Sequence, residues 1–218
     1  MYNFPHKRQG LLVAITSIMA IFAIIVVLVA GFFIVYSRSH VNGLSMLPTL
    51  NAELDTTNDR DVVYINRFAD IDKGDIVVLD LRKNSNFSGY TIKRLIATGG
   101  DIVNITYNSK TIEYDLTVNG KVVYSKPHKA FGNNTYNSFV QYVNNHNQDT
   151  TRIRYDLNGD LEGVVIKPNE IFVLGDNWDL SKDSSAVGPF KQSTIVGRVD
   201  IVVKPSQNEL WQVLKRIF

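Results

Sequence analysis

The chain has 218 residues, with 23 Lys and Arg against 21 Asp and Glu, and it contains no cysteine. The lack of cysteine excludes disulfides, thiolate zinc sites and a cysteine nucleophile, and a net charge of +2 is too small to indicate nucleic acid as the main partner. The length suffices for a membrane anchor and one domain of about 180 residues. The histidines lack ligand spacing, so we expect no catalytic metal and no cofactor; they are His6, His40, His128 and His146.

Residues 11–36 form an uncharged apolar run near the N-terminus. As a helix this run would extend about 39 Å, which is enough to cross a hydrocarbon core of about 30 Å. It is longer than the apolar region of a secretory signal, which has about 7–15 residues, so we expect an uncleaved transmembrane anchor. Lys7 and Arg8 precede the run and Arg38 follows it. The positive-inside rule therefore favours a cytoplasmic segment 1–10 and a remaining chain outside the cytoplasm.

Between residues 40 and 205 the signals are those of strands. Asn119-Gly120 between β-prone flanks predicts a hairpin. No amphipathic helix of 12 residues is expected in this range. The segment 131–150 is rich in Asn and is interpreted as a polar loop or excursion. The pattern predicts a mainly β domain with antiparallel or mixed sheets. Further strands are expected at 61–65, 76–79, 90–96, 102–105, 163–166, 171–174 and 195–203.

The hairpin and the polar segment separate two strand-rich blocks. We therefore expect a core from residues 37–102 and 163–205, with residues 103–162 as an inserted β-rich lobe. The tail 206–218 is predicted as an amphipathic helix, because Leu210, Val213, Leu214 and Ile217 follow helical spacing. With Trp211, Lys215 and Arg216, this helix would suit a membrane surface as well as packing on the domain, and both alternatives stay open.

Ser45 lies in a turn a few residues after the anchor, between Gly43 and Pro48. Glycine permits unusual backbone angles and proline restricts the turn. Successive N–H groups around Ser45 and Met46 could hold a developing oxyanion. A serine in such a loop is more often structural, so a catalytic role needs a partner.

Lys93 is the candidate partner, because it lies between Ile92 and the apolar pair Leu95-Ile96 in an expected strand. A surface lysine is possible there, but burial would disfavour the ammonium form and lower the lysine pKa. The free amine could then accept the Ser45 hydroxyl proton in place of a histidine. A third block, 174–185, reads as a polar turn whose hydroxyls and carboxylates could orient the amine and bind an arginine.

Together with the anchor, these blocks resemble the type I signal peptidases of bacteria, which are membrane-anchored Ser–Lys proteases. The resemblance covers the anchor and essentially the whole remaining chain. It is carried by Ser-Met-x-Pro-Thr at 45–49, Gly-Asp-x-Val at 74–77, Lys-Arg at 93–94 closed by Gly-Asp at 100–101, and Gly-Asp-Asn followed by Ser-x-Asp-Ser at 175–177 and 181–184.

The resemblance implies a role for each matching residue. Ser45 would be the nucleophile and oxyanion donor through its backbone N–H, and Lys93 the general base. Ser181 would orient the lysine amine, while Asp183 and Arg94 would form a supporting ion pair.

The resemblance also implies a substrate, partners and a location. Shallow apolar pockets would accept the small side chains of small-x-small cleavage sites; their candidate residues are Val41, Leu50, Val77 and Ile92. The substrates would be preproteins with signal peptides, and the lipid bilayer would be a partner, with the secretion translocon as a further candidate. The enzyme would be a single-pass protein of the cell membrane with an extracytoplasmic catalytic domain.

Four positions depart from the family pattern. Ser185 stands where the last block usually ends in arginine, Trp178 where arginine is frequent, and Gly99 where proline is usual. Gly43 stands where some members carry a serine that contributes to the oxyanion hole.

Two rival functions share parts of this pattern. A non-catalytic assembly factor with the same fold would be expected to lack the serine or the lysine. A self-cleaving regulator would use the same dyad, but it fits poorly with an anchor and no DNA-binding segment. A distance of about 2.6–3.2 Å between the Lys93 amine and Ser45 Oγ would favour the enzyme over the assembly factor.

Overall fold

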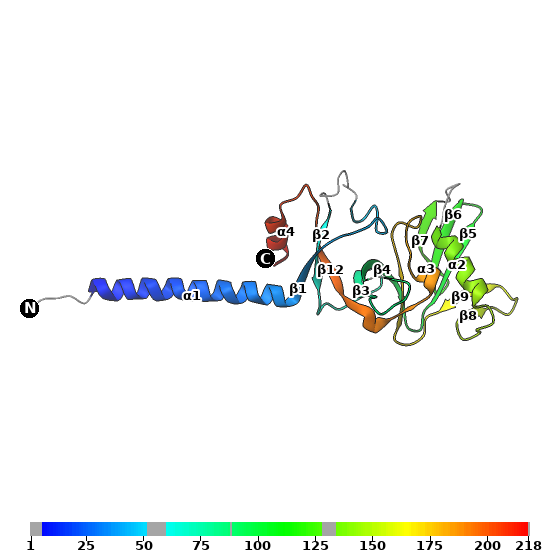
Figure 1. The fold of residues 1–218 in the computed structure, drawn as a ribbon, viewed down its shortest axis with the longest axis horizontal. Coiled ribbons are helices and arrows are strands. Elements are labelled where there is room, and N and C mark those ends of the chain that lie inside the picture. Colours follow the sequence, from blue (N-terminus) through cyan, green and yellow to red (C-terminus); the bar gives the residue numbers. More distant parts are fainter. Residues whose placement is uncertain (1–5, 52–59, 88, 128–133, 218) are drawn as a thin grey trace, which may run out of the picture. The chain divides into compact units, whose positions relative to one another are not determined.

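The computed structural model describes residues 6–51, 60–87, 89–127 and 134–217, and the chain divides into two compact units at Ser37 and Arg38 (Figure 1). The first unit contains helix α1, His6–Val35. Its stretch Gly10–Val35 has a mean hydropathy of 3.2 and, by length and composition, could cross a membrane. This segment agrees with the predicted anchor.

The larger sheet belongs mainly to the second unit and has seven strands in the order β1-β2-β12-β3-β4-β10-β11. From β2 to β11, neighbouring strands run antiparallel, as predicted for a mainly β domain. The strands are β1 Tyr36–His40, β2 Val62–Asn66, β3 Ile76–Asp80, β4 Tyr90–Thr98, β10 Glu170–Leu174, β11 Phe190–Lys191 and β12 Ile195–Val203.

A second antiparallel sheet is formed by consecutive strands in the order β7-β6-β5-β9-β8. The predicted hairpin lies here, and Asn119 and Gly120 take φ angles of 53° and 76°, the positive values that a tight two-residue hairpin requires. The strands are β5 Ile102–Asn108, β6 Glu113–Val118, β7 Lys121–Pro127, β8 Ile153–Tyr155 and β9 Leu161–Val165. These strands lie between residues 102 and 165, and residues 128–133 of the predicted lobe lie outside the described residues.

The main apolar core joins the two sheets. Ile96 and Phe172 from the larger sheet pack in one cluster with Val103 and Leu116 from the smaller one. Burial of this shared apolar surface stabilises both sheets at once. Among the described residues, the buried apolar side chains of the smaller sheet belong to this shared cluster.

Helix α2, Asn134–Asn145, corrects the prediction of a polar loop over 131–150, of which residues 131–133 lie outside the described residues. Its buried side chains are Thr135, Phe139, Tyr142 and Val143, which share one helical face. Apart from Val140, the exposed positions of the helix are Asn and Gln, so its apolar stripe is narrow and the polar composition favoured a loop. Two short helices also went unpredicted, α3 at Ser184–Val187 and a 3₁₀ turn at Gln192–Thr194.

Helix α4, Glu209–Ile217, confirms the predicted C-terminal helix and packs against β12. Val213 is buried, while Leu210 and Trp211 are 68% and 57% exposed. The Glu209 carboxylate accepts two bonds from Arg38 and one from the Tyr64 hydroxyl. These donors hold the pKa of Glu209 at about 2. Of the two alternatives left open for this helix, the structure shows packing on the domain for the helix face that carries Val213.

Phe139→Ala tests whether α2 is an integral part of the core. Phe139 is fully buried and meets Phe172 edge to face with ring centroids 6.5 Å apart. Its loss should lower the free energy of unfolding by about 3–5 kcal/mol, because a large buried side chain leaves a cavity. Chemical denaturation of the full chain in detergent measures this, with the neighbouring exposed Val140→Ala as control. Equal effects of the two variants would contradict the assignment.

Candidate active site

Ser45 lies in the turn that follows β1, and the side chains of Val41, Met46 and Leu50 in this segment are buried. Gly43 has a φ of +99°, a conformation that favours glycine. Backbone bonds from Leu47 N to Leu44 O and from Leu50 N to Met46 O close the turn. Apolar side chains of the turn pack with residues of β2 and β3 in one buried cluster. Its members are Val41, Met46, Leu50, Val63, Ile65 and Val78.

Lys93 in β4 contacts Ser45 directly. Its Nζ lies 2.7 Å from Ser45 Oγ and 3.1 Å from the carbonyl oxygen of Ile92. The side chain is buried at 3% exposure. This burial lowers the pKa of Lys93 below its ordinary value, although the carboxylates of Asp183 and Asp176 act to raise it.

The loop after β10 closes over this pair. The pairing of β10 with β4 ends at Leu174 and Arg94, so Gly175 follows at the level of the dyad. Asn177 then donates through its backbone N–H to Ser45 O at 2.9 Å and through Nδ2 to Leu44 O at 3.1 Å. A Cβ on Gly175 would overlap Ser45 O and Ser181 Oγ, so only glycine permits this approach.

Ser181 does not orient the lysine in the manner expected. Its hydroxyl donates to Asp183 Oδ2, and no hydrogen bond between Ser181 and Lys93 occurs among the described residues. Asp183 is fully buried and also accepts from Gly175 N at 2.9 Å. Ser181 therefore binds the Asp183 carboxylate, because a carboxylate is a stronger hydrogen-bond acceptor than a neutral amine.

Ser185 explains how the chain tolerates the missing arginine. Its hydroxyl donates to Asp183 Oδ1 at 2.8 Å and its backbone N–H donates to the same atom at 3.1 Å. Asp183 thereby caps the N-terminus of α3. Neutral donors satisfy this buried carboxylate, so a cation is not needed there.

The expected ion pair between Arg94 and Asp183 is wrong. Arg94 instead pairs with Asp176, through Nε at 2.8 Å and Nη2 at 2.6 Å, and donates to Gly74 O at 2.7 Å. Successive strand side chains point to opposite faces, so Arg94 is directed away from the face of Lys93. Burial would raise the pKa of Asp176, but bonds from Arg94 and Thr49 outweigh it and the pKa is lowered.

A cavity of about 490 Å³ adjoins Ser45 and includes two of the four predicted pocket residues, Val41 and Ile92. Leu50 and Val77 are absent from its lining and lie in the apolar core at 1% and 0% exposure. Val77 is the cross-strand partner of Lys93 and packs with Leu95 and Ile171. Unpredicted apolar lining residues are Met46, Ile65 and Val78.

Two further departures from the family pattern are accommodated by packing. Trp178 is buried in the main core, and its carbonyl accepts from the backbone N–H and the hydroxyl of Thr135 in α2. A Cβ on Gly99 would lie 3.0 Å from both Lys167 O and Pro168 Cα, so the site favours the smallest residue. The unpredicted helix α2 thus supports the loop that closes over the dyad.

Thr49, Asp176 and Asn177 join the site without having been assigned a role from sequence. Thr49 Oγ1 donates to Asp176 Oδ2 at 2.6 Å, which links the serine turn to the loop after β10. Their signal was their position inside the two blocks that contain Ser45 and Asp183. Within the described ranges, no group of three His, Asp or Glu residues could hold a metal ion.

Comparison with known proteins adds an independent line of support. The family model for signal peptidase, peptidase S26, matches residues 14–204. Signal peptidase IB of Staphylococcus aureus is 30% identical over 181 residues, covering 81% of this chain and 82% of the relative. Signal peptidase I P of Bacillus subtilis subsp. natto is 27% identical over 211 residues, covering 94% and 96%.

Among solved structures, a signal peptidase I from Enterococcus faecalis V583 matches at 21% identity with a TM-score of 0.35, covering 61% of this chain and 98% of that one. The assignment rests on the sequence matches, which extend from the anchor to the end of β12. The chain belongs to the bacterial type I signal peptidase family, peptidase S26, and is a serine endopeptidase.

Proposed function

We propose that Ser45 is the nucleophile and Lys93 the general base with which this signal peptidase cleaves signal peptides from exported preproteins. The 2.7 Å separation of Lys93 Nζ and Ser45 Oγ carries the proposal. It lies inside the range of about 2.6–3.2 Å that a proton transfer needs. A non-catalytic factor would have no use for a buried lysine on a serine hydroxyl.

The reaction follows from this contact. The neutral Lys93 amine takes the Ser45 hydroxyl proton while Oγ bonds to the scissile carbonyl carbon, with the Ser45 backbone N–H as a donor to the oxyanion. Collapse breaks the C–N bond, and the lysine returns its proton to the leaving amine. Water then attacks the acyl-enzyme with Lys93 again as base, which releases the signal peptide and restores Ser45.

The cavity beside Ser45 is the proposed site for the residues that precede the cut. Val41, Ile92 and Met46 give it apolar walls next to the nucleophile. The small side chains of small-x-small cleavage sites are the proposed occupants. Leu50 and Val77 contribute by supporting the loop and the strand from below.

The proposed setting is the cell membrane. Helix α1 would be the single-pass anchor, with residues 1–10 in the cytoplasm because Lys7 and Arg8 precede the span. The catalytic unit would then act outside the cytoplasm, close to the bilayer and to emerging preproteins. The secretion translocon is a candidate partner in this arrangement, and residues 103–162 would form a lobe inserted in the catalytic core.

Ser45→Ala tests the proposal as a whole. The full chain, reconstituted in detergent or lipid, should cleave an exported preprotein at its small-x-small site, and the variant should show no cleavage because it lacks the attacking oxygen. Gel analysis with sequencing of the new N-terminus measures the cut. Retained cleavage by folded Ser45→Ala would exclude the assignment.

Lys93→Met and Lys93→Arg test the base. We expect both to lower kcat by at least about 100-fold, the lower range for loss of general-base catalysis. Arginine should not rescue activity, because its guanidinium keeps its proton at any working pH. Lys182→Arg, at an exposed position near the site, is a matched control. A clearly active Lys93→Arg enzyme would rule out the proton-transfer role.

The pH dependence of cleavage should report Lys93. Burial lowers its pKa, so the active free amine forms as pH rises, and the rising limb should have its midpoint below the ordinary lysine value of about 10.4. Initial rates of peptide cleavage across a pH series measure this midpoint. A profile without a rising limb would contradict the role of a titrating amine.

A further inference from the structure

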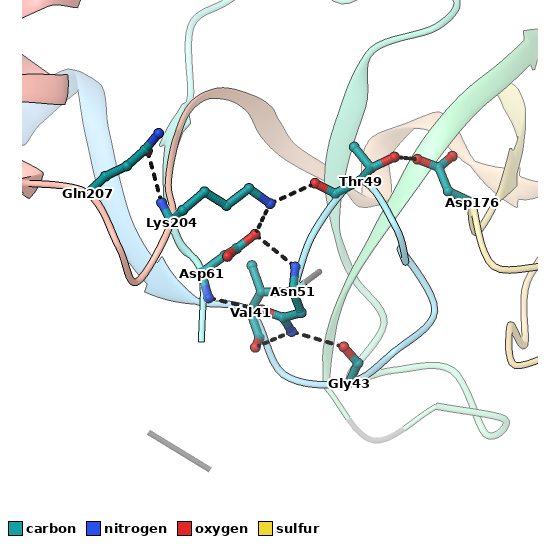
Figure 2. Close-up of polar contacts among 8 residues, drawn as sticks. All are labelled: Val41, Gly43, Thr49, Asn51, Asp61, Asp176, Lys204 and Gln207. Carbon is teal, nitrogen blue, oxygen red and sulfur yellow. Dashed lines mark hydrogen bonds and ion pairs between the residues drawn. The ribbon is translucent and has the colours of Figure 1, made fainter. Parts of the chain in front are cut away.

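A buried asparagine closes the turn that carries Ser45. Asn51 Nδ2 donates to the carbonyl oxygens of Val41 and Gly43 at 3.0 and 3.1 Å, so one side chain joins the start of the turn to its end (Figure 2). Asn51 is 1% exposed and has a φ of 60°, a left-handed conformation that asparagine tolerates better than most residues. The shape of the turn therefore depends on where Asn51 is held.

Asp61 holds Asn51 through a reciprocal pair of bonds. The Asn51 backbone N–H donates to Asp61 Oδ2 at 2.8 Å, and Asn51 Oδ1 accepts from the Asp61 backbone N–H at 2.9 Å. Asp61 is fully buried, and among the residues that the structure describes its Oδ1 has no hydrogen-bond partner. Its charge is thus compensated through Oδ2 alone.

Lys204, directly after β12, supplies that compensation and a second contact. Its Nζ donates to Asp61 Oδ2 at 2.7 Å and to the carbonyl oxygen of Thr49 at 3.0 Å. Gln207 Oε1 accepts from the Lys204 backbone N–H at 3.1 Å and holds the lysine in place. Figure 2 shows these bonds converging between the serine turn and the segment that leaves β12.

Thr49 extends the contacts toward the general base. Its hydroxyl donates to Asp176, and Asp176 is paired with Arg94, the neighbour of Lys93 in β4. One continuous series of polar contacts therefore connects Lys204 to the strand that carries the base. Lys204 itself is absent from the residues that line the cavity at Ser45.

We propose that Lys204, acting through Asp61 and Asn51, is a positioning residue that sets the distance between Ser45 and Lys93. The proposal rests on the roles of Ser45 and Lys93 given under Proposed function. A displacement of about 1 Å at reacting atoms can cost about 100-fold in rate. A fully buried carboxylate paired with a partly exposed lysine at 22% exposure is a costly means of filling space, since apolar residues of similar volume are often as stable. Here the ammonium does what an apolar residue could not, because it also binds the Thr49 carbonyl.

Lys204→Met alone is an incomplete test, because it leaves the Asp61 carboxylate buried without a cation and unfolding could account for any loss. The double variant Asp61→Asn/Lys204→Met removes both charges and should recover stability, while the contact with Thr49 stays lost. Arg152→Met is the matched control. It breaks a half-buried ion pair with Glu170 away from the serine turn.

All variants are studied as the full chain in detergent, with Tm, kcat and KM for a signal-sequence peptide, and the pH profile of kcat. We expect the double variant to keep a near wild-type Tm and a KM within about twofold, with kcat lowered about 10- to 100-fold. The midpoint of its rising pH limb should move up, because a looser turn would rehydrate Lys93. Arg152→Met should lower Tm and leave the kcat of the folded enzyme unchanged.

The result that overturns the proposal is a double variant whose kcat and pH midpoint return to wild type together with its Tm. In that case Lys204 would only compensate a buried charge. The comparison with Ser45→Ala separates this failure from failure of the proposed function. If Ser45→Ala is inactive while the double variant is fully active, only the positioning role is wrong; if folded Ser45→Ala still cleaves, both are wrong.

Discussion

The burial of one lysine against one serine is the constraint around which the catalytic unit is arranged. Lys93 lies 2.7 Å from Ser45 Oγ at 3% exposure. A buried ammonium is costly, so the surroundings favour the neutral amine that base catalysis needs. The carboxylates of Asp183 and Asp176 act in the opposite direction. Burial is the larger effect and the pKa of Lys93 is lowered, while each carboxylate is satisfied by other donors.

The two carboxylates are divided between the two faces of β4. Asp183 lies on the side of Lys93 and is satisfied by hydroxyl and backbone donors, including Ser185. Asp176 takes the guanidinium of Arg94 on the other side. These neutral donors explain why the chain can lose one arginine of the family pattern without leaving the buried Asp183 carboxylate short of hydrogen bonds.

Distant parts of the chain support the short turn that carries Ser45. Asn177 bonds the turn from the loop after β10, and Lys204 bonds it from the segment after β12. Helix α2 supports the first of these loops through Thr135 and Trp178. A turn of this length cannot hold a side chain to a fraction of an ångström by itself, and support from rigid elements supplies the required precision.

The sequence by itself determined the anchor, most strands, the hairpin at Asn119-Gly120 and the proximity of Ser45 and Lys93, because these follow from local patterns and four ordered blocks. It could not determine the partner of Arg94, the acceptor of Ser181 or the pocket role of Val77, since strand register and loop closure decide which faces meet. The sequence also did not reveal α2, because the helix has few apolar residues and its buried face was recognised only from the packing. Only the tertiary structure showed that Lys204 pairs with Asp61, which is 143 residues away in the chain. A buried carboxylate needs a donor that is close in space, and sequence separation does not reveal which one that is.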